Sequence, residues 1–130
     1  MINSVKTCAV LIGGEMKVLI CGDRHWGNVA VIRRELKKLP CDTVIIHGAA
    51  PGADTIGANI AYELGMRTVA FPADWKRYGK AAGPLRNIEM LNEKPDLVLA
   101  FHHDLSKSKG TAHTVRNAQT RNIKVKVIND

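Results

Sequence analysis

The sequence predicts an α/β fold in which a five-stranded parallel sheet lies between two layers of helices. Three observations support this prediction. Short apolar runs alternate with segments whose apolar residues recur at helical spacing. Glycine and proline stand where helices would end or begin, at Gly65 and at Gly83-Pro84. The links between the elements are short, which favours right-handed crossovers and a sheet covered on both faces. The expected arrangement is a Rossmann-like three-layer domain.

The elements follow in a regular order along the chain. The apolar runs predict five strands, at Val18–Cys21, Val44–Ile46, Thr68–Phe71, Leu97–Phe101 and Val125–Ile128. Apolar residues share one face of a predicted helix in three of the intervening segments: Val29, Ile32, Leu36 and Leu39; Ile56, Ile60 and Leu64; and Ala112, Val115 and Ala118. A further helix is expected to begin at Gly83-Pro84.

Strand composition predicts the order of the strands in the sheet. The first, second and fourth runs are apolar throughout, as central strands buried on both faces should be. The fifth run alternates apolar residues with Lys124 and Lys126, which indicates an edge strand. The third run is preceded by Met66-Arg67, which is compatible with the opposite edge. We therefore expect the order 3-2-1-4-5, with the topological switch point between the first and fourth strands.

Length and composition set outer limits. The length of 130 residues fits a single domain, which we expect to span residues 16–130. The net charge of the chain is +7. Residues 1–15 are expected to be a peripheral arm or an upstream addition before the natural start at Met16. No apolar run approaches the roughly 20 residues of a membrane span. Three cysteines without Cys-x-x-Cys spacing do not indicate a disulfide framework or a zinc knuckle. A cytoplasmic location without membrane contact is expected.

The most informative motif is the loop from His47 to Asp54, which follows a β-branched run and opens into a helical pattern. Glycines Gly48 and Gly52 allow close approach of backbone N–H groups, and the start of the helix favours an anion. The loop matches neither the Walker A motif nor the Gly-x-Gly-x-x-Gly fingerprint. It predicts a phosphate site; the alternative is a tight strand-to-helix connection.

Polar residues gather in the loops that follow the first four strands. These loops span residues 22–26, 47–54, 71–87 and 102–111. Since the carboxyl ends of parallel strands meet at one rim of the sheet, the loops should surround a common site.

The loop residues also resemble a known family. The motifs are His-Gly-x-x-x-Gly-Ala-Asp from His47, Phe-Pro-Ala-Asp-Trp from Phe71, Gly-Lys-Ala-Ala-Gly-Pro-x-Arg-Asn from Gly79, and Lys-Gly-Thr-Ala from Lys109. They resemble the YspA-type, cpYpsA-related branch of the SLOG superfamily over residues 16–127. That superfamily includes sensors of nucleotide-derived ligands, the Lonely Guy phosphoribohydrolases and the DprA proteins. The resemblance implies a nucleotide-derived ligand and a homodimer. No resident cofactor is expected.

Specific residues are predicted to hold that ligand. Arg86 would clamp a phosphate through two donors, Lys80 would add a point charge, and Trp75 or Trp26 would stack on a base. Thr111 is either a hydroxyl donor or a helix cap. Asp54 would bind a ribose hydroxyl or complement the helix N-terminus. The full predicted binding set is Gly22, Arg24, Gly48, Gly52, Asp54, Trp75, Lys80, Arg86, Asn87, Gly110 and Thr111.

A sensor or sequestering protein is favoured over an enzyme. In the phosphoribohydrolase branch, Gly-Gly-x-Gly-Thr-x-x-Glu supplies a glutamate that assists N-glycosidic cleavage. Here Thr114 stands at that glutamate, and Ser108 and Lys109 replace the glycine pair. An N-glycosidic hydrolase remains the alternative and would need another carboxylate. The candidates are Asp23, Asp54 and Asp74.

Three further interpretations concern a metal site, nucleic-acid binding and self-association. His25, His47, His102 and His103 match no zinc spacing, so no metal is expected. DprA-like nucleic-acid binding is permitted by the net charge of +7, although the aromatic residues do not interleave with a basic face. Self-association is expected at the helix that begins at Pro84, with Met90 at the contact; the alternative is a helix buried against the sheet.

Overall fold

The computed structural model describes residues 15–130. The strands are β1 (Lys17–Gly22), β2 (Val44–His47), β3 (Arg67–Ala70), β4 (Leu97–Phe101) and β5 (Lys124–Ile128). The helices are α1 (Val29–Lys37), α2 (Ala53–Glu63), α3 (Trp75–Tyr78), α4 (Ala82–Asn92) and α5 (Gly110–Thr120), with 3₁₀ turns η1 (Gly79–Ala81) and η2 (Leu105–Lys107). Apart from Glu15, the predicted arm of residues 1–15 lies outside the described residues.

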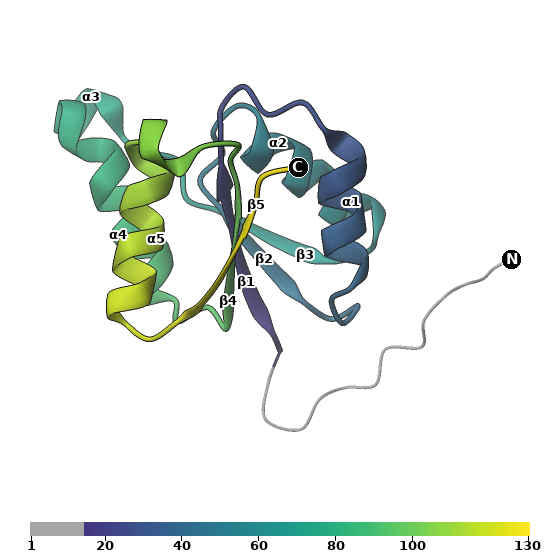
Figure 1. The fold of residues 1–130 in the computed structure, drawn as a ribbon. Coiled ribbons are helices and arrows are strands. Elements are labelled where there is room, and N and C mark those ends of the chain that lie inside the picture. The colour runs from purple at the N-terminus through teal and green to yellow at the C-terminus, as the bar shows by residue number, and fades with distance from the viewer. Residues whose placement is uncertain (1–14) are drawn as a thin grey trace, which may run out of the picture.

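All five strands form one parallel sheet in the order β3-β2-β1-β4-β5, which confirms the predicted order. The strand β1 lies at the centre, and the chain builds outward from it in both directions (Figure 1). Loops that follow β1 and β4 therefore diverge at the predicted switch point.

Helices cover both faces of the sheet, as the alternation along β1 requires. Val18 and Ile20 join a buried cluster with residues of α1 and α2, whereas Leu19 and Cys21 join a second cluster with residues of α4 and α5. Figure 1 shows the two helical layers on opposite sides of the strands. The predicted three-layer fold is confirmed.

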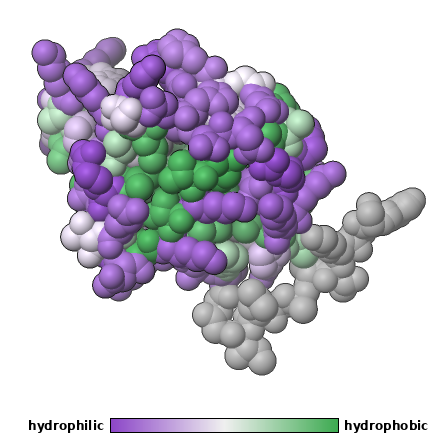
Figure 2. All heavy atoms as spheres, in the orientation of Figure 1, coloured by the Kyte–Doolittle hydropathy of each residue, from purple (hydrophilic) through white to green (hydrophobic). Residues whose placement is uncertain are grey.

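The two edge strands expose more of their side chains than the central ones. All four residues of β3 are exposed, and β5 exposes Lys124, Lys126 and Val127. Figure 2 shows apolar atoms in the middle of the face that carries β5, surrounded by hydrophilic side chains. Lysines at such an edge discourage pairing with another sheet.

One local element was not predicted from the apolar pattern. The segment after β3 forms the four-residue helix α3 and the turn η1 before α4 begins. Asp74 starts α3 by accepting a hydrogen bond from the backbone N–H of Arg77 at 3.1 Å. No residue of α3 or η1 is buried. These turns therefore have no buried apolar face, and apolar periodicity in the sequence could not predict them.

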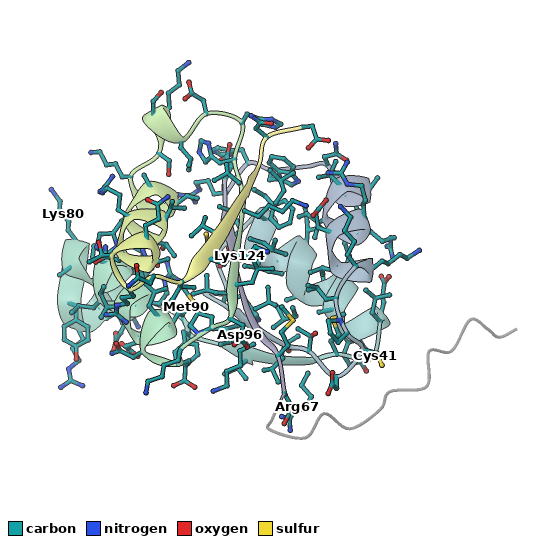
Figure 3. The ribbon with its side chains drawn as sticks, turned by 60° about the horizontal axis from the view of Figure 1, so that its bottom comes forward. Cys41, Arg67, Lys80, Met90, Asp96 and Lys124 are labelled. Atoms are coloured by element: carbon teal, nitrogen blue, oxygen red, sulfur yellow. The ribbon has the colours of Figure 1, made fainter. Side chains whose placement is uncertain are left out.

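The helix α4 is buried more deeply than a contact surface would be. Met90 and Leu91 are each 1% exposed and belong to the buried cluster between the sheet and the helices α4 and α5. Figure 3 places Met90 inside the fold. The expectation that Met90 lies at an intermolecular contact is therefore wrong for this chain. Its side chain fills the space between α4 and the sheet, which was the alternative explanation. Leu85, on the same helix, is 43% exposed.

Candidate functional site

An open cleft of about 1090 Å³ lies at the carboxyl ends of the strands. Residues that follow β1, β2, β3 and β4 all contribute to its walls, together with the start of α5. The four loops that the sequence placed at one rim of the sheet thus meet around one cavity. Its volume is slightly above the range of about 300–1,000 Å³ that is typical of small-molecule sites.

The cleft carries a clear excess of positive charge. Six of its lining residues are lysines or arginines, and two are aspartates, Asp23 and Asp54. The basic residues are Arg24, Lys80, Arg86, Lys107, Lys109 and Arg116. Within residues 15–130, none of these six forms an ion pair with a carboxylate. Their charges are therefore available to attract an anion.

The loop after β2 is braced from within by Asp54. The carboxylate of Asp54 accepts a hydrogen bond from the backbone N–H of Gly48 at 2.8 Å, and it also accepts from the backbone of Ala50. Burial raises the pKa of Asp54 to about 6, although those hydrogen bonds and the charge of Arg86 act in the opposite direction. Asp54 is 5% exposed, so its first role is to hold the loop.

The same loop uses backbone conformations that suit close approach. Gly52 has a φ of +77°, and a Cβ there would collide with the backbone of Asp23 and Arg24 in the neighbouring loop. Ala49 has a φ of 57°, unusual for a residue with a Cβ. Its N–H donates to Nδ1 of the buried His47 at 3.1 Å. Several loop N–H groups are thus already paired inside the protein.

Arg86 joins the loops after β2 and β3. Its Nη1 donates to the carbonyl oxygens of Gly48, at 2.5 Å, and Phe71, at 3.4 Å. Its Nε donates to Oδ1 of Asn87 at 3.0 Å. Among the described residues, Nη2 has no hydrogen-bond partner, so the free donors of this guanidinium lie on one nitrogen. A clamp that uses two nitrogens, as the sequence suggested, would have to release one of these bonds.

Asn87 links Arg86 to the start of α5. Its Nδ2 lies 3.4 Å from the carbonyl oxygen of Gly110 and 3.4 Å from Nδ1 of His113. The Asn87 side chain is 6% exposed and all its polar atoms have partners. Its contribution to the cleft is therefore to hold its neighbours in place.

The start of α5 is capped by a residue that the sequence interpretation did not single out for this role. The hydroxyl of Ser108 accepts hydrogen bonds from the N–H groups of Thr111, at 3.0 Å, and Ala112, at 3.3 Å. Thr111, considered as the cap, is instead a buried cleft residue, 6% exposed. Thr114 donates its hydroxyl proton to the carbonyl oxygen of Gly110 at 3.3 Å. Serine is among the residues preferred at the start of a helix, which is the signal that could have identified Ser108.

The two tryptophans differ in position. Trp75 lines the cleft and is 59% exposed, with its ring against Gly83. Trp26 is 2% exposed; its ring stacks on His103 with centroids 4.5 Å apart and tilts against Phe101. Trp75 is thus available for stacking on a planar ligand, whereas Trp26 covers the end of the core. Lys80, on η1, extends from the outer side of the molecule (Figure 3).

Ten of the eleven predicted binding residues line the cleft. The exception is Gly52, which does not line the cleft and lies against the backbone of Asp23 and Arg24. Of the three carboxylates considered for catalysis, Asp23 and Asp54 line the cleft, whereas Asp74 caps α3 outside it. Polar lining residues absent from the predicted set are His25, His102, Lys107, Ser108, Lys109, His113, Thr114 and Arg116. Most of these follow β4, where position after a strand end was the available signal.

Two features of residues 15–130 bear on metal binding and on membrane insertion. No three His, Cys, Asp or Glu side chains in that range are grouped so that they would hold a metal ion. No helix in that range has the length and apolar character needed to cross a bilayer.

The chain is similar to known proteins in both its sequence and its fold. Residues 16–78 match the model of the YspA, cpYpsA-related SLOG family. The chain is 41% identical to the Gene 61 protein of Mycobacterium phage D29, over 84% of this chain and 93% of that protein. The fold resembles the X-ray structure of DNA processing protein A (DprA) from Streptococcus pneumoniae, with a TM-score of 0.72 at 21% identity. That likeness covers 87% of this chain and half of DprA, and it concerns the fold alone.

Proposed function

This chain belongs to the YspA, cpYpsA-related SLOG family, and from that premise we propose that it binds a nucleotide-derived anion in the cleft. The ligand would be a nucleoside phosphate or a molecule of the ADP-ribose or NAD type. The protein would act as a sensor of this molecule or would sequester it. Family membership supports a role connected with nucleotides or nucleic acids.

The observation that carries the proposal is the charge of the cleft. Six basic residues line it against two aspartates, and one of those aspartates is already bound to the Gly48 N–H. A phosphate would neutralise this excess, and the unpartnered Nη2 of Arg86 would donate to it. Trp75 at the rim offers an exposed ring for a base.

The test is calorimetric titration of the 130-residue chain with AMP, ADP and ADP-ribose. We expect saturable binding to at least one of them, weakened at least tenfold by Arg86→Ala. Arg77→Ala is the matched control, because Arg77 does not line the cleft and stacks on Tyr78. Since Arg86 also braces two loops, a Lys107→Ala/Lys109→Ala variant provides a second test. Absence of wild-type binding, or unchanged affinity in both variants, would refute the proposal.

The hydrolase alternative is supported by one group, the Asp54 carboxyl. Its pKa near 6 would allow proton exchange near neutral pH, and it lines the cleft. Chromatography of the same mixtures separates this alternative from simple binding, since a hydrolase would release the free base. A sensor would leave the nucleotide intact.

Nucleic-acid binding is the alternative that the fold likeness to DNA processing protein A suggests. It predicts that affinity falls steeply with salt and that AMP does not compete. A gel-shift assay with single-stranded DNA at physiological salt, with and without AMP, distinguishes nucleic-acid binding from nucleotide binding.

We also propose that the chain forms a homodimer, and the exposed Leu85 of α4 supports this proposal.

A further inference from the structure

The hydrogen bonds around Asn87 determine which atoms donate. Arg86 can only donate, so the Asn87 oxygen must be the atom that faces Nε of Arg86, at 3.0 Å. The NH₂ group of Asn87 is thereby turned toward α5, where it lies 3.4 Å from the carbonyl oxygen of Gly110. A carbonyl oxygen only accepts, so this contact agrees with the same orientation of the amide.

The orientation of Asn87 in turn determines the tautomer of His113. The NH₂ group of Asn87 lies 3.4 Å from Nδ1 of His113 and can only donate to it. Nδ1 must therefore carry a lone pair, and the neutral ring carries its proton on Nε2. Among residues 15–130, Nε2 has no hydrogen-bond partner, and His113 lines the cleft.

A second histidine at the cleft is constrained in the same way. Nδ1 of His102 accepts a hydrogen bond from the backbone N–H of Asp104 at 3.0 Å, so its neutral ring also carries the proton on Nε2. His102 follows β4 and lines the cleft, as His113 does. The cleft thus adds neutral donors of fixed direction to its six cations.

We propose that Asn87 is a positioning residue that holds His113 as an Nε2–H donor to an oxygen of the bound ligand. The inference rests on the proposed function, because it assigns the contact to the same cleft. The inference also limits which chemical group of the ligand can lie at this position. A group that only accepts, such as a phosphoryl or carboxylate oxygen, matches the donors of Arg86 and His113. A ligand that presents an ammonium group there, which only donates, would leave those protons unpaired.

The first test measures the tautomer and needs no ligand. In ¹⁵N-histidine-labelled protein, long-range ¹H–¹⁵N spectra above the titration range should show His113 with an unprotonated Nδ1 and a protonated Nε2. In Asn87→Asp the carboxylate can only accept, so the proton should move to Nδ1. Asn92→Asp, which adds the same charge at the far end of α4, should leave the His113 tautomer unchanged. A protonated Nδ1 in the wild type would overturn the inference.

The second test measures binding of AMP by calorimetry. His113→Leu should weaken it by about 3- to 10-fold, the effect of one neutral hydrogen bond. His113→Gln keeps an N–H donor and should recover part of the loss. Asn87→Asp also adds negative charge, so the double variant Asn87→Asp/His113→Gln isolates the tautomer: it should bind AMP more tightly than Asn87→Asp alone.

The outcomes separate the two proposals. Unchanged AMP affinity in His113→Leu, or no recovery in the double variant, would refute the contact while the proposed function stands. Failure of the wild type to bind AMP, ADP or ADP-ribose would refute the proposed function and the ligand contact together. The spectra would still decide whether Asn87 sets the His113 tautomer.

Discussion

The N–H of Gly48 donates to the carboxylate of Asp54, and the carbonyl of the same residue accepts from Arg86. Both polar groups of Gly48 are therefore paired with side chains from different helices, α2 and α4. The sequence suggested that the Gly48 N–H would hold a phosphate directly. In the structure, the Gly48 N–H donates to Asp54 instead. Among the described residues, Nη2 of Arg86 has no hydrogen-bond partner. An anion would therefore meet the guanidinium before it meets this backbone.

A first prediction follows for Gly48→Ala. A Cβ at this position would collide with the guanidinium of Arg86. We expect a loss of about 1–3 kcal/mol in the free energy of unfolding, because the loop or Arg86 must shift. Binding of the nucleotide should weaken as well. Urea denaturation checks the first effect and calorimetry the second.

The matched control is Gly27→Ala, since no atom lies within 4 Å of a Cβ built there. Its unfolding free energy should stay close to that of the wild type. Equal stability of the Gly48 and Gly27 variants would mean that Arg86 moves aside at no cost.

A second prediction concerns pH and Asp54. Its pKa in the fold is about 6, above the usual 3.8, mainly because of burial. The folded state therefore binds this proton more tightly than the unfolded chain does. The contribution to stability is greatest below pH 4 and is lost as the pH rises to about 6, by about 3 kcal/mol in all.

The comparison is between wild type and Asp54→Asn, by urea denaturation at several pH values. The difference in unfolding free energy between the two should change between pH 4 and 6 and be constant above pH 7. Parallel curves over that range would show that Asp54 titrates normally.

A third prediction concerns Glu35 on α1, whose side chain is 2% exposed. It accepts hydrogen bonds from Lys126 at 2.6 Å, Arg34 at 2.9 Å and Lys38 at 3.0 Å. Burial alone would raise the pKa of Glu35, but these three cations outweigh it and lower the pKa to about 2. This contribution to stability is thus present above pH 4.5 and is lost as the pH falls toward 2.

Glu35→Gln should lower the free energy of unfolding by about 1–3 kcal/mol at pH 7, because hydrogen bonds to charged groups are lost. The deficit should shrink as the pH falls below 4.5. Glu89→Gln is the control, since Glu89 is exposed and lies on α4. A deficit that is the same at pH 3 and pH 7 would exclude an ionic origin.

The strand order could be predicted because it depends on local composition. Apolar runs mark β1, β2 and β4 as central, and Lys124 and Lys126 mark β5 as an edge. The rim of the sheet that carries the cleft follows from that order. Their positions after strand ends were therefore enough to predict that Arg24, Asp54 and Arg86 would line one cavity.

The connections inside the cleft could not be predicted in the same way. Arg86 reaches Gly48 across 38 residues of sequence, and Asn87 reaches His113 across 26. Such contacts depend on side-chain rotamers and on the angle between α4 and α5, which periodicity does not report. Residue type alone suggested that Arg86 and Asn87 face a ligand, whereas much of their hydrogen bonding is internal.

The last prediction tests self-association through α4. Leu85 is 43% exposed, and Met90 on the same helix is 1% exposed in the core beneath the sheet. If the homodimer forms through this helix, Leu85→Glu should convert it to a monomer and leave the fold intact. Light scattering should then give a mass near 14.2 kDa in place of twice that value, with an unchanged circular dichroism spectrum. Met90→Glu is the contrast, because a buried carboxylate without a partner should unfold the protein outright. A wild type that already scatters as 14.2 kDa at all concentrations would refute the dimer. A Leu85→Glu protein that stays dimeric would move the interface away from α4.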